Sequence, residues 1–239
     1  MNYNQHSKKS IKISYKTNLK RRLSKEISPF TFEDLPLNFT GDVVFSDLYV
    51  FQKVLGAGSF GVVFAAVEKQ HLEHCAIKIV SKNMSRNSTL TKICYEAEVL
   101  SKLEHPSIVK FHRTHSSSYH YFIVMELLKP GSLWDLLYLR TKEKRPLDER
   151  ECRIIMKQIF EGLVYLHSIN IVHRDLKPAN ILLKSFDYLE DSVRLADFGL
   201  CTKVDPEPHY NPTERCGTIS YMAPEVIQGK QYSFVTLFR

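Results

Sequence analysis

The sequence predicts an α+β fold in which a strand-rich segment with one helix precedes a mainly helical segment. Short runs of β-branched and aromatic residues predict strands at 49–51, 62–64, 75–80, 108–111 and 121–126. A helix is expected at 93–103, because Glu96, Leu100 and Leu103 fall on one helical face there. Ordered structure is expected to begin near Leu48.

The second segment carries two expected helices. One starts at 131–133, and a longer one runs over 148–168. Within the longer helix, Ile155, Ile159 and Leu163 recur at intervals of four residues, which gives this helix one apolar face.

Composition describes an ordinary globular chain with a basic N-terminal tail. The 239 residues are 44% hydrophobic and 25% charged, as in soluble globular proteins. Eight of the 33 Lys and Arg residues lie within 8–25, where there is no acid, and the remaining 25 face 26 acidic residues. We expect a disordered extension over 1–45, whose basic run either stays solvated or binds an anionic partner such as lipid or nucleic acid.

Targeting features are missing from the sequence. Polar and basic residues follow Met1 without the apolar stretch of a secretory signal, and no apolar run is long enough to span a bilayer. Five scattered cysteines without a C-x-x-C pair predict reduced thiols rather than disulfides or a zinc site. We therefore expect an intracellular protein, in the cytoplasm with the nucleus as the alternative, and no transmembrane segment.

The stretch 171–183 gathers the residues best suited to chemistry. Apolar residues flank a polar group that includes Asp175, Lys177 and Asn180, and Pro178 interrupts any helix, so the polar side chains lie on a rigid turn. Such a turn can hold Asp175 to accept a proton, Lys177 to meet a developing negative charge and Asn180 to bind a metal. The alternative is a surface turn whose charges only pair with one another.

This stretch resembles the catalytic loop of protein kinases, H-R-D-x-x-x-x-N. Later in the chain, 197–199 matches the family's D-F-G element and 223–225 matches A-P-E, while 216–218 resembles the substrate-docking loop. The D-L-K-P-x-N form with Lys177 is that of Ser/Thr kinases, related to the calcium/calmodulin-dependent type. The resemblance implies a two-lobe kinase fold over 48–239.

The resemblance implies an N-lobe over 48–128, with a five-stranded antiparallel sheet and one helix. The C-lobe covers 129–239 and is mainly helical. It is expected to be incomplete, because family members continue with further helices. The resemblance also implies that Leu100, Phe111, His173 and Phe198 stack on one another.

A glycine-rich pattern, G-x-G-x-x-G, begins at Gly56. In a dinucleotide-binding fold it would open a helix, but strand residues continue at 62–64, which favours the flap that covers ATP in kinases. The resemblance implies that Lys78 holds phosphates and pairs with Glu96 rather than Glu98; a surface lysine is the alternative. The implied nucleotide-binding residues are Leu55, Gly56, Ala57, Gly58, Ser59, Phe60, Gly61, Val62, Val63, Ala76, Lys78, Glu96, Met125, Glu126, Leu128 and Leu182.

The resemblance further implies that Asp175 and Lys177 are catalytic and that Asn180 and Asp197 bind Mg²⁺. ATP and Mg²⁺ are then the cofactors, and protein serine or threonine hydroxyls are the substrates. The alternative function, from a different class, is a kinase-derived fragment that binds nucleotide or a partner without transferring phosphate.

One departure from the family concerns activation. Many relatives carry a phosphothreonine two residues before the C-G-T element, where it neutralises the arginine of the catalytic loop. Here that position is Glu214, preceded by Thr213. We expect Glu214 to pair with Arg174 in a two-pronged contact and to give partial ordering without phosphorylation. The alternative is that Glu214 is solvated and Thr213 is the regulatory site.

Overall fold

The computed structural model describes residues 45–58, 61–82, 87–117, 120–204 and 212–232. The described residues form two compact units, which fall within 1–83 with 115–122 and within 84–114 with 123–239. The basic tail and the predicted site residues Ser59 and Phe60 lie outside the described residues, so the expected anionic partner of the tail stays a prediction, as do the expected lobe boundaries.

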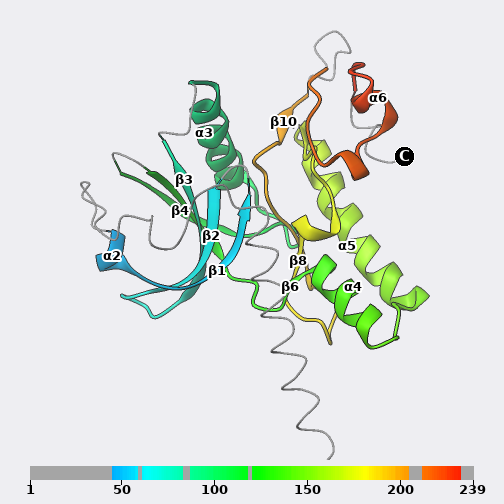
Figure 1. The fold of residues 1–239 in the computed structure, drawn as a ribbon, viewed down its shortest axis with the longest axis horizontal. Coiled ribbons are helices and arrows are strands. Elements are labelled where there is room, and N and C mark those ends of the chain that lie inside the picture. The colour runs from blue at the N-terminus through cyan, green and yellow to red at the C-terminus, as the bar shows by residue number, and fades with distance from the viewer. Residues whose placement is uncertain (1–44, 59–60, 83–86, 118–119, 205–211, 233–239) are drawn as a thin grey trace, which may run out of the picture. The chain divides into compact units, whose positions relative to one another are not determined.

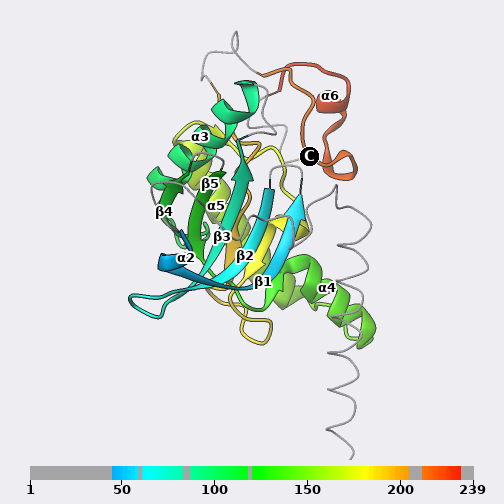
Figure 2. The same cartoon turned by 60° about the vertical axis from the view of Figure 1, so that its left-hand side comes forward.

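The first unit is built on three consecutive strands. A short helix, α2 (Phe45–Leu48), leads into β1 (Tyr49–Gly58), β2 (Gly61–Glu68) and β3 (His74–Ser81). Both β1 with β2 and β2 with β3 pair antiparallel, as Figure 2 shows. Gly61 is required by geometry: its φ is +132°, and a Cβ atom there would lie 2.2 Å from the carbonyl oxygen of Ile79.

The complete sheet has five strands in the order β1-β2-β3-β5-β4, with β4 at Phe111–Ser116 and β5 at His120–Glu126. The prediction of a strand at 108–111 was wrong except at its last residue. Ile108 makes only an isolated parallel bridge to Leu195, and the backbone N–H of Val109 donates to the Leu195 carbonyl at 2.9 Å. This apolar stretch is buried against the second unit's own core rather than in the sheet.

Three long helices belong to the second unit: α3 (Asn87–Lys102), α4 (Leu133–Lys142) and α5 (Glu149–Ser168). Ser132 and Asp148 cap α4 and α5, and in each case an acid three residues later returns the hydrogen bond to complete a capping box. Each such cap contributes about 1 kcal/mol to stability. The predicted starts of both helices are confirmed.

Short strands, two 3₁₀ turns and a short helix lie between the loops of the second unit. Figure 1 labels the strands β6, β8 and β10 and the helix α6 among them. The elements are β6 (Gly131–Ser132), β7 (Ile171–Val172), a 3₁₀ turn (Pro178–Asn180), β8 (Ile181–Leu183), β9 (Val193–Leu195), β10 (Thr202–Lys203), a second 3₁₀ turn (Ile219–Tyr221) and α6 (Pro224–Ile227). The strands form two small sheets, β6-β8-β9 and β10-β7.

The core of the second unit is one cluster of buried apolar side chains. The predicted apolar face of α5, Ile155, Ile159 and Leu163, lies in it together with Leu100 and Phe198. The cluster packs beneath the small strands that flank 173–180, so this loop rests on a rigid base.

The four side chains expected to stack on one another lie in or against this core. Phe111 packs against the cluster that contains Leu100 and Phe198, and the His173 ring centroid lies 5.0 Å from that of Phe198.

Among the described residues no helix is long and apolar enough to cross a membrane. None of the four cysteines described with side chains, Cys75, Cys152, Cys201 and Cys216, forms a disulfide.

Candidate active site

The loop 173–180 connects β7 to β8, and buried strand residues anchor both of its ends. Arg174 has φ +66°, a left-handed conformation that few non-glycine residues adopt. Pro178 then begins a 3₁₀ turn that ends at Asn180. The loop therefore has a fixed course, as the sequence predicted.

Both oxygens of the Asp175 carboxylate accept hydrogen bonds. Lys177 Nζ donates to Oδ2 at 2.7 Å and Asn180 Nδ2 donates to the same oxygen at 3.0 Å. The Thr218 hydroxyl donates to Oδ1 at 2.7 Å. The side chain is buried, yet its Oδ1 already accepts a threonine hydroxyl, so its position suits interaction with a hydroxyl group.

Thr218 is a site residue that the sequence reasoning did not identify. Its hydroxyl accepts a hydrogen bond from Lys177 Nζ at 2.7 Å while it donates to Asp175. Gly217 permits this approach, because its φ is +109° and a Cβ atom there would lie 2.5 Å from the Arg174 carbonyl oxygen. The only sequence signal was the C-G-T motif itself.

His173 fixes the backbone beside Asp175. Its Nδ1 accepts the Asp175 backbone N–H at 3.3 Å, which leaves Nε2 to donate to the Ala196 carbonyl at 3.0 Å. Burial lowers the pKa of His173, and the hydrogen bond to Ala196 only partly opposes this effect. The neutral imidazole thus joins the loop 173–180 to the residue before Asp197.

Asn180 and Asp197 are brought close together by β8 and β9. Ile181 pairs with Leu195, and the Ala196 N–H donates to the Asn180 carbonyl at 2.9 Å, so the two side chains leave adjacent strand ends. Asn180 Nδ2 donates to Asp175. The Asn180 Oδ1 atom is therefore the part of this side chain that could bind a cation. An amide oxygen beside an exposed carboxylate provides the hard oxygen ligands that fit Mg²⁺.

In the first unit, the predicted nucleotide-binding residues lie on three strands. Leu55, Gly56, Ala57 and Gly58 are on β1, Gly61, Val62 and Val63 are on β2, and Ala76 and Lys78 are on β3. Lys78 stands opposite Val63 in the strand register and is only 6% exposed. This burial does not fit the alternative of a surface lysine.

The remaining predicted nucleotide-binding residues belong to the second unit. On α3, Glu96 is 2% exposed, whereas Glu98 is exposed and pairs with Lys102 at 2.6 Å on the same helix. This difference supports the choice of Glu96. Because Lys78 and Glu96 belong to different units, the ion pair expected between them stays a prediction.

The predicted adenine-binding segment covers the end of β5 and the residues after it. Met125, Glu126 and Leu128 are half-buried, as is Leu182 on β8. Glu126 Oε1 accepts the backbone N–H of Lys110 at 2.8 Å and lies 3.3 Å from Arg194 Nε. These contacts fix the side chain at the start of the segment.

The predicted pair between Arg174 and Glu214 is confirmed: Arg174 Nη1 lies 3.2 Å from Glu214 Oε2. The expected two-pronged geometry is not what the structure has. Arg174 Nε instead donates to the Leu200 carbonyl, so one guanidinium nitrogen, Nη1, meets one carboxylate oxygen.

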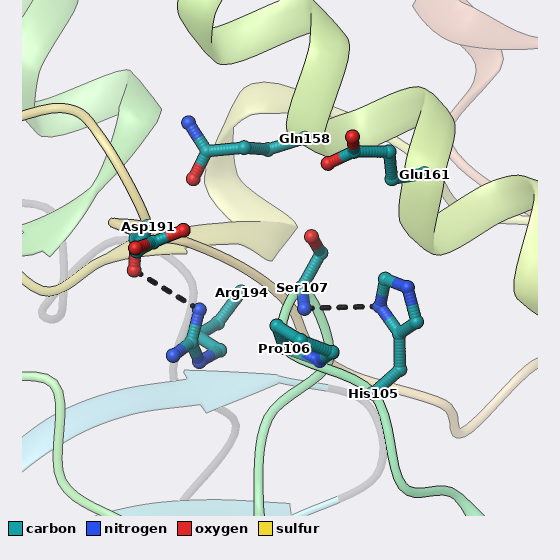
Figure 3. A pocket seen from close by; sticks show the side chains of 7 residues that line it. All are labelled: His105, Pro106, Ser107, Gln158, Glu161, Asp191 and Arg194. Atoms are coloured by element: carbon teal, nitrogen blue, oxygen red, sulfur yellow. Dashed lines mark hydrogen bonds between the residues drawn. The ribbon is translucent and has the colours of Figure 1, made fainter.

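A separate pocket of about 370 Å³ opens in the second unit (Figure 3). It is lined by His105, Pro106, Ser107, Gln158, Glu161, Asp191 and Arg194. Polar groups in it bond within the fold: His105 Nδ1 accepts the Ser107 N–H, and Arg194 Nη1 donates to the Asp191 carbonyl. None of the predicted catalytic or metal-binding residues lines this pocket, so it is not part of the candidate site.

Comparison with known proteins gives one consistent family. The model of the protein kinase domain family matches residues 49–236. A probable myosin light chain kinase of Dictyostelium discoideum is 42% identical over 179 residues, which is 75% of this chain and 54% of the relative. Calcium-dependent protein kinase 4 of Plasmodium berghei is 34% identical over 233 residues, 93% of this chain and 43% of the relative.

Serine/threonine-protein kinase 33 of Bos taurus is 31% identical over 229 residues, 92% of this chain and 46% of the relative. The chain thus spans about half the length of these three relatives.

Proposed function

Because the chain belongs to the protein kinase family, we propose that it transfers the γ-phosphate of ATP to serine or threonine hydroxyls of proteins. One observation carries this proposal: a threonine hydroxyl already lies 2.7 Å from Asp175 Oδ1, the distance at which a substrate hydroxyl would be oriented and deprotonated.

Asp175 is the proton acceptor. Among the described residues Oδ2 has two donors and Oδ1 has one, so Oδ1 keeps a lone pair for a substrate hydroxyl. As the hydroxyl oxygen bonds to the γ-phosphorus, its proton passes to Asp175 and the bond to the β-phosphate breaks. Lys177 Nζ then stabilises the charge on the transferring group.

Asn180 and Asp197 would hold Mg²⁺, which supplies charge neutralisation at the phosphate oxygens. Lys78, Glu96 and the glycine-rich hairpin 55–63 would bind the nucleotide, and the segment from Met125 to Leu128 would contact adenine. Each of these assignments follows from motif position in the family.

A second candidate function is a kinase-related module that binds nucleotide or a partner without transferring phosphate. It is favoured by α5, on which Met156, Phe160 and Val164 recur at intervals of four residues and are exposed. An exposed apolar stripe on a helix is typical of a surface that another polypeptide covers.

One experiment separates the two functions. Purified residues 1–239 are assayed with Mg·ATP and a serine/threonine-containing protein, beside Asp175→Asn and the control Asp187→Asn, which changes an exposed aspartate outside the site. We expect turnover that Asp175→Asn lowers by about 10²- to 10⁴-fold, the usual contribution of a general base. A cooperative melt and nucleotide binding without turnover in any variant would instead establish the binding module.

A further inference from the structure

Tyr232 is a buried residue, 5% exposed, that none of the roles above uses. Its hydroxyl accepts a hydrogen bond from Arg174 Nη1 at 3.1 Å and donates to the backbone carbonyl of Glu214 at 2.9 Å. Its own backbone N–H donates to the Pro212 carbonyl at 3.2 Å. The residue therefore makes one hydrogen bond to the catalytic loop and two to the segment around Glu214.

Proton positions in this cluster are determined by its chemistry. Arginine can only donate and a carbonyl can only accept, so the phenol must keep its proton to make both bonds. Burial raises the pKa of Tyr232, although the hydrogen bond from Arg174 opposes this effect. The neutral phenol that the geometry requires is thus the form that burial favours.

Arg174 is the centre of the cluster. Its Nε donates to the Leu200 carbonyl, and its Nη1 is shared by Glu214 Oε2 and the Tyr232 hydroxyl. The next residue along the chain is Asp175. The guanidinium therefore joins the catalytic loop to the residues after Phe198 and to the segment 212–216.

The same segment leads directly to the contact that defines the site. Gly217 packs against the Arg174 carbonyl, and Thr218 bonds both Asp175 and Lys177. Only three residues, 215–217, lie between Glu214, which Tyr232 holds, and Thr218. Because the backbone here is short and held at both ends, releasing Glu214 would loosen the position of Thr218.

We propose that Tyr232 is a positioning residue of this site, whose hydroxyl holds the Glu214 backbone against Arg174 and thereby keeps Thr218 beside Asp175. This proposal rests on the proposed function for its effect on turnover, but not for its effect on the segment. The carboxylate of Glu214 places a negative charge beside Arg174. The buried Tyr232 hydroxyl instead holds the Glu214 backbone in place, which a half-exposed carboxylate cannot do.

The decisive variant is Tyr232→Phe, which keeps the ring and removes only the hydroxyl. Its control is Tyr188→Phe, at a tyrosine that is 68% exposed. Amide hydrogen exchange across residues 213–221 is measured first, because it requires no activity. We expect faster exchange in Tyr232→Phe and unchanged exchange in Tyr188→Phe.

Kinetics with Mg·ATP and a protein substrate then distinguish positioning from packing. We expect kcat to fall by about tenfold, in line with one hydrogen bond to a charged group, and KM for ATP to stay unchanged. A role in packing alone would lower the melting temperature without changing kcat well below the melt. Unchanged exchange and unchanged kcat in a folded Tyr232→Phe protein would overturn the proposal.

Two further outcomes remain decisive. If the wild-type chain shows no turnover, the proposed function fails, and hydrogen exchange alone decides the role of Tyr232. If Tyr232→Phe does not melt cooperatively, Arg174→Met removes the hydroxyl's donor instead and is compared with Glu214→Gln. Faster exchange at 213–221 in Arg174→Met than in Glu214→Gln supports the proposal, and equal exchange overturns it.

Discussion

Thr218 and Asp175 are 43 residues apart in the sequence, yet the Thr218 hydroxyl donates to Asp175 Oδ1 at 2.7 Å. The same hydroxyl accepts a hydrogen bond from Lys177. Thr218 therefore orients both residues proposed to carry the chemistry, and a substrate hydroxyl would be expected to bind Asp175 Oδ1 beside it.

Replacing Thr218 by valine should lower kcat by about 10- to 100-fold, because valine keeps the shape and loses both hydrogen bonds to charged groups. Thr218→Ser restores the hydroxyl and should recover most of the activity. Steady-state kinetics on the two variants provides the comparison. Equal activity in the valine and serine variants would show that the hydroxyl has no part in orienting Asp175.

Lys78→Met should weaken Mg·ATP capture or phosphate transfer by orders of magnitude, because it removes a proposed contact to phosphate charge. The substitution fits a buried strand position, since Lys78 is 6% exposed and methionine is apolar and flexible. Lys53→Met, at an exposed position on β1, is the matched control. A folded Lys78→Met protein with nearly normal binding and turnover would mean that another residue holds the phosphates.

The part of the site that the sequence predicted best is the loop with Asp175, Lys177 and Asn180. These residues lie within six positions of one another, so local spacing fixes their relation. Thr218 and Tyr232 lie 43 and 58 residues from their partners in that loop, Asp175 and Arg174. No local pattern encodes such contacts, because they depend on how the chain returns to the loop.

The errors in the sequence prediction have the same origin. Residues 108–110 have the composition of a strand, but Ile108 bridges to Leu195 of β9 and the Val109 N–H donates to the Leu195 carbonyl. The sheet strand β4 therefore begins only at Phe111. Arg174 was expected to bond both carboxylate oxygens of Glu214, but its Nε donates to the Leu200 carbonyl instead. In both cases a distant backbone carbonyl or amide decided the outcome, and composition does not reveal such a partner.

Burial of His173 should make stability depend on pH. Burial lowers the pKa of His173 in the folded protein below the ordinary value of 6.5. As the pH falls below about 6.5, the unfolded chain binds a proton that the native site does not, so the native state loses stability. The loss approaches about 1.4 kcal/mol per pH unit for one such group.

Urea unfolding at about pH 7.5 and about pH 5 measures this dependence. The free energy of unfolding should be lower at the acidic pH in the wild type, and His173→Gln should reduce the difference. His74→Gln, at an exposed histidine on β3, serves as the control. A pH difference that His173→Gln leaves unchanged would assign the effect to other histidines, such as the half-buried His167, whose pKa is also lowered by burial.

The contact between Glu214 and Arg174 predicts basal activity without phosphorylation of the loop. The Arg174 side chain is 8% exposed and Glu214 is half exposed, so the pairing offsets part of the cost of burying the guanidinium. A carboxylate carries one negative charge, whereas a phosphate carries about 1.5 to 2 at neutral pH, so the ordering should be partial. We expect phosphatase-treated protein to retain measurable turnover.

Glu214→Ala and Thr213→Ala, compared in phosphatase-treated protein, test this expectation. Removing the carboxylate leaves a largely buried guanidinium with the Leu200 carbonyl and the Tyr232 hydroxyl as partners, and turnover should fall by about tenfold. Thr213 is exposed, so its replacement should leave turnover unchanged. Full activity in Glu214→Ala together with loss of activity in Thr213→Ala would show that Thr213 is the regulatory residue and that the Glu214 carboxylate has no role in activity.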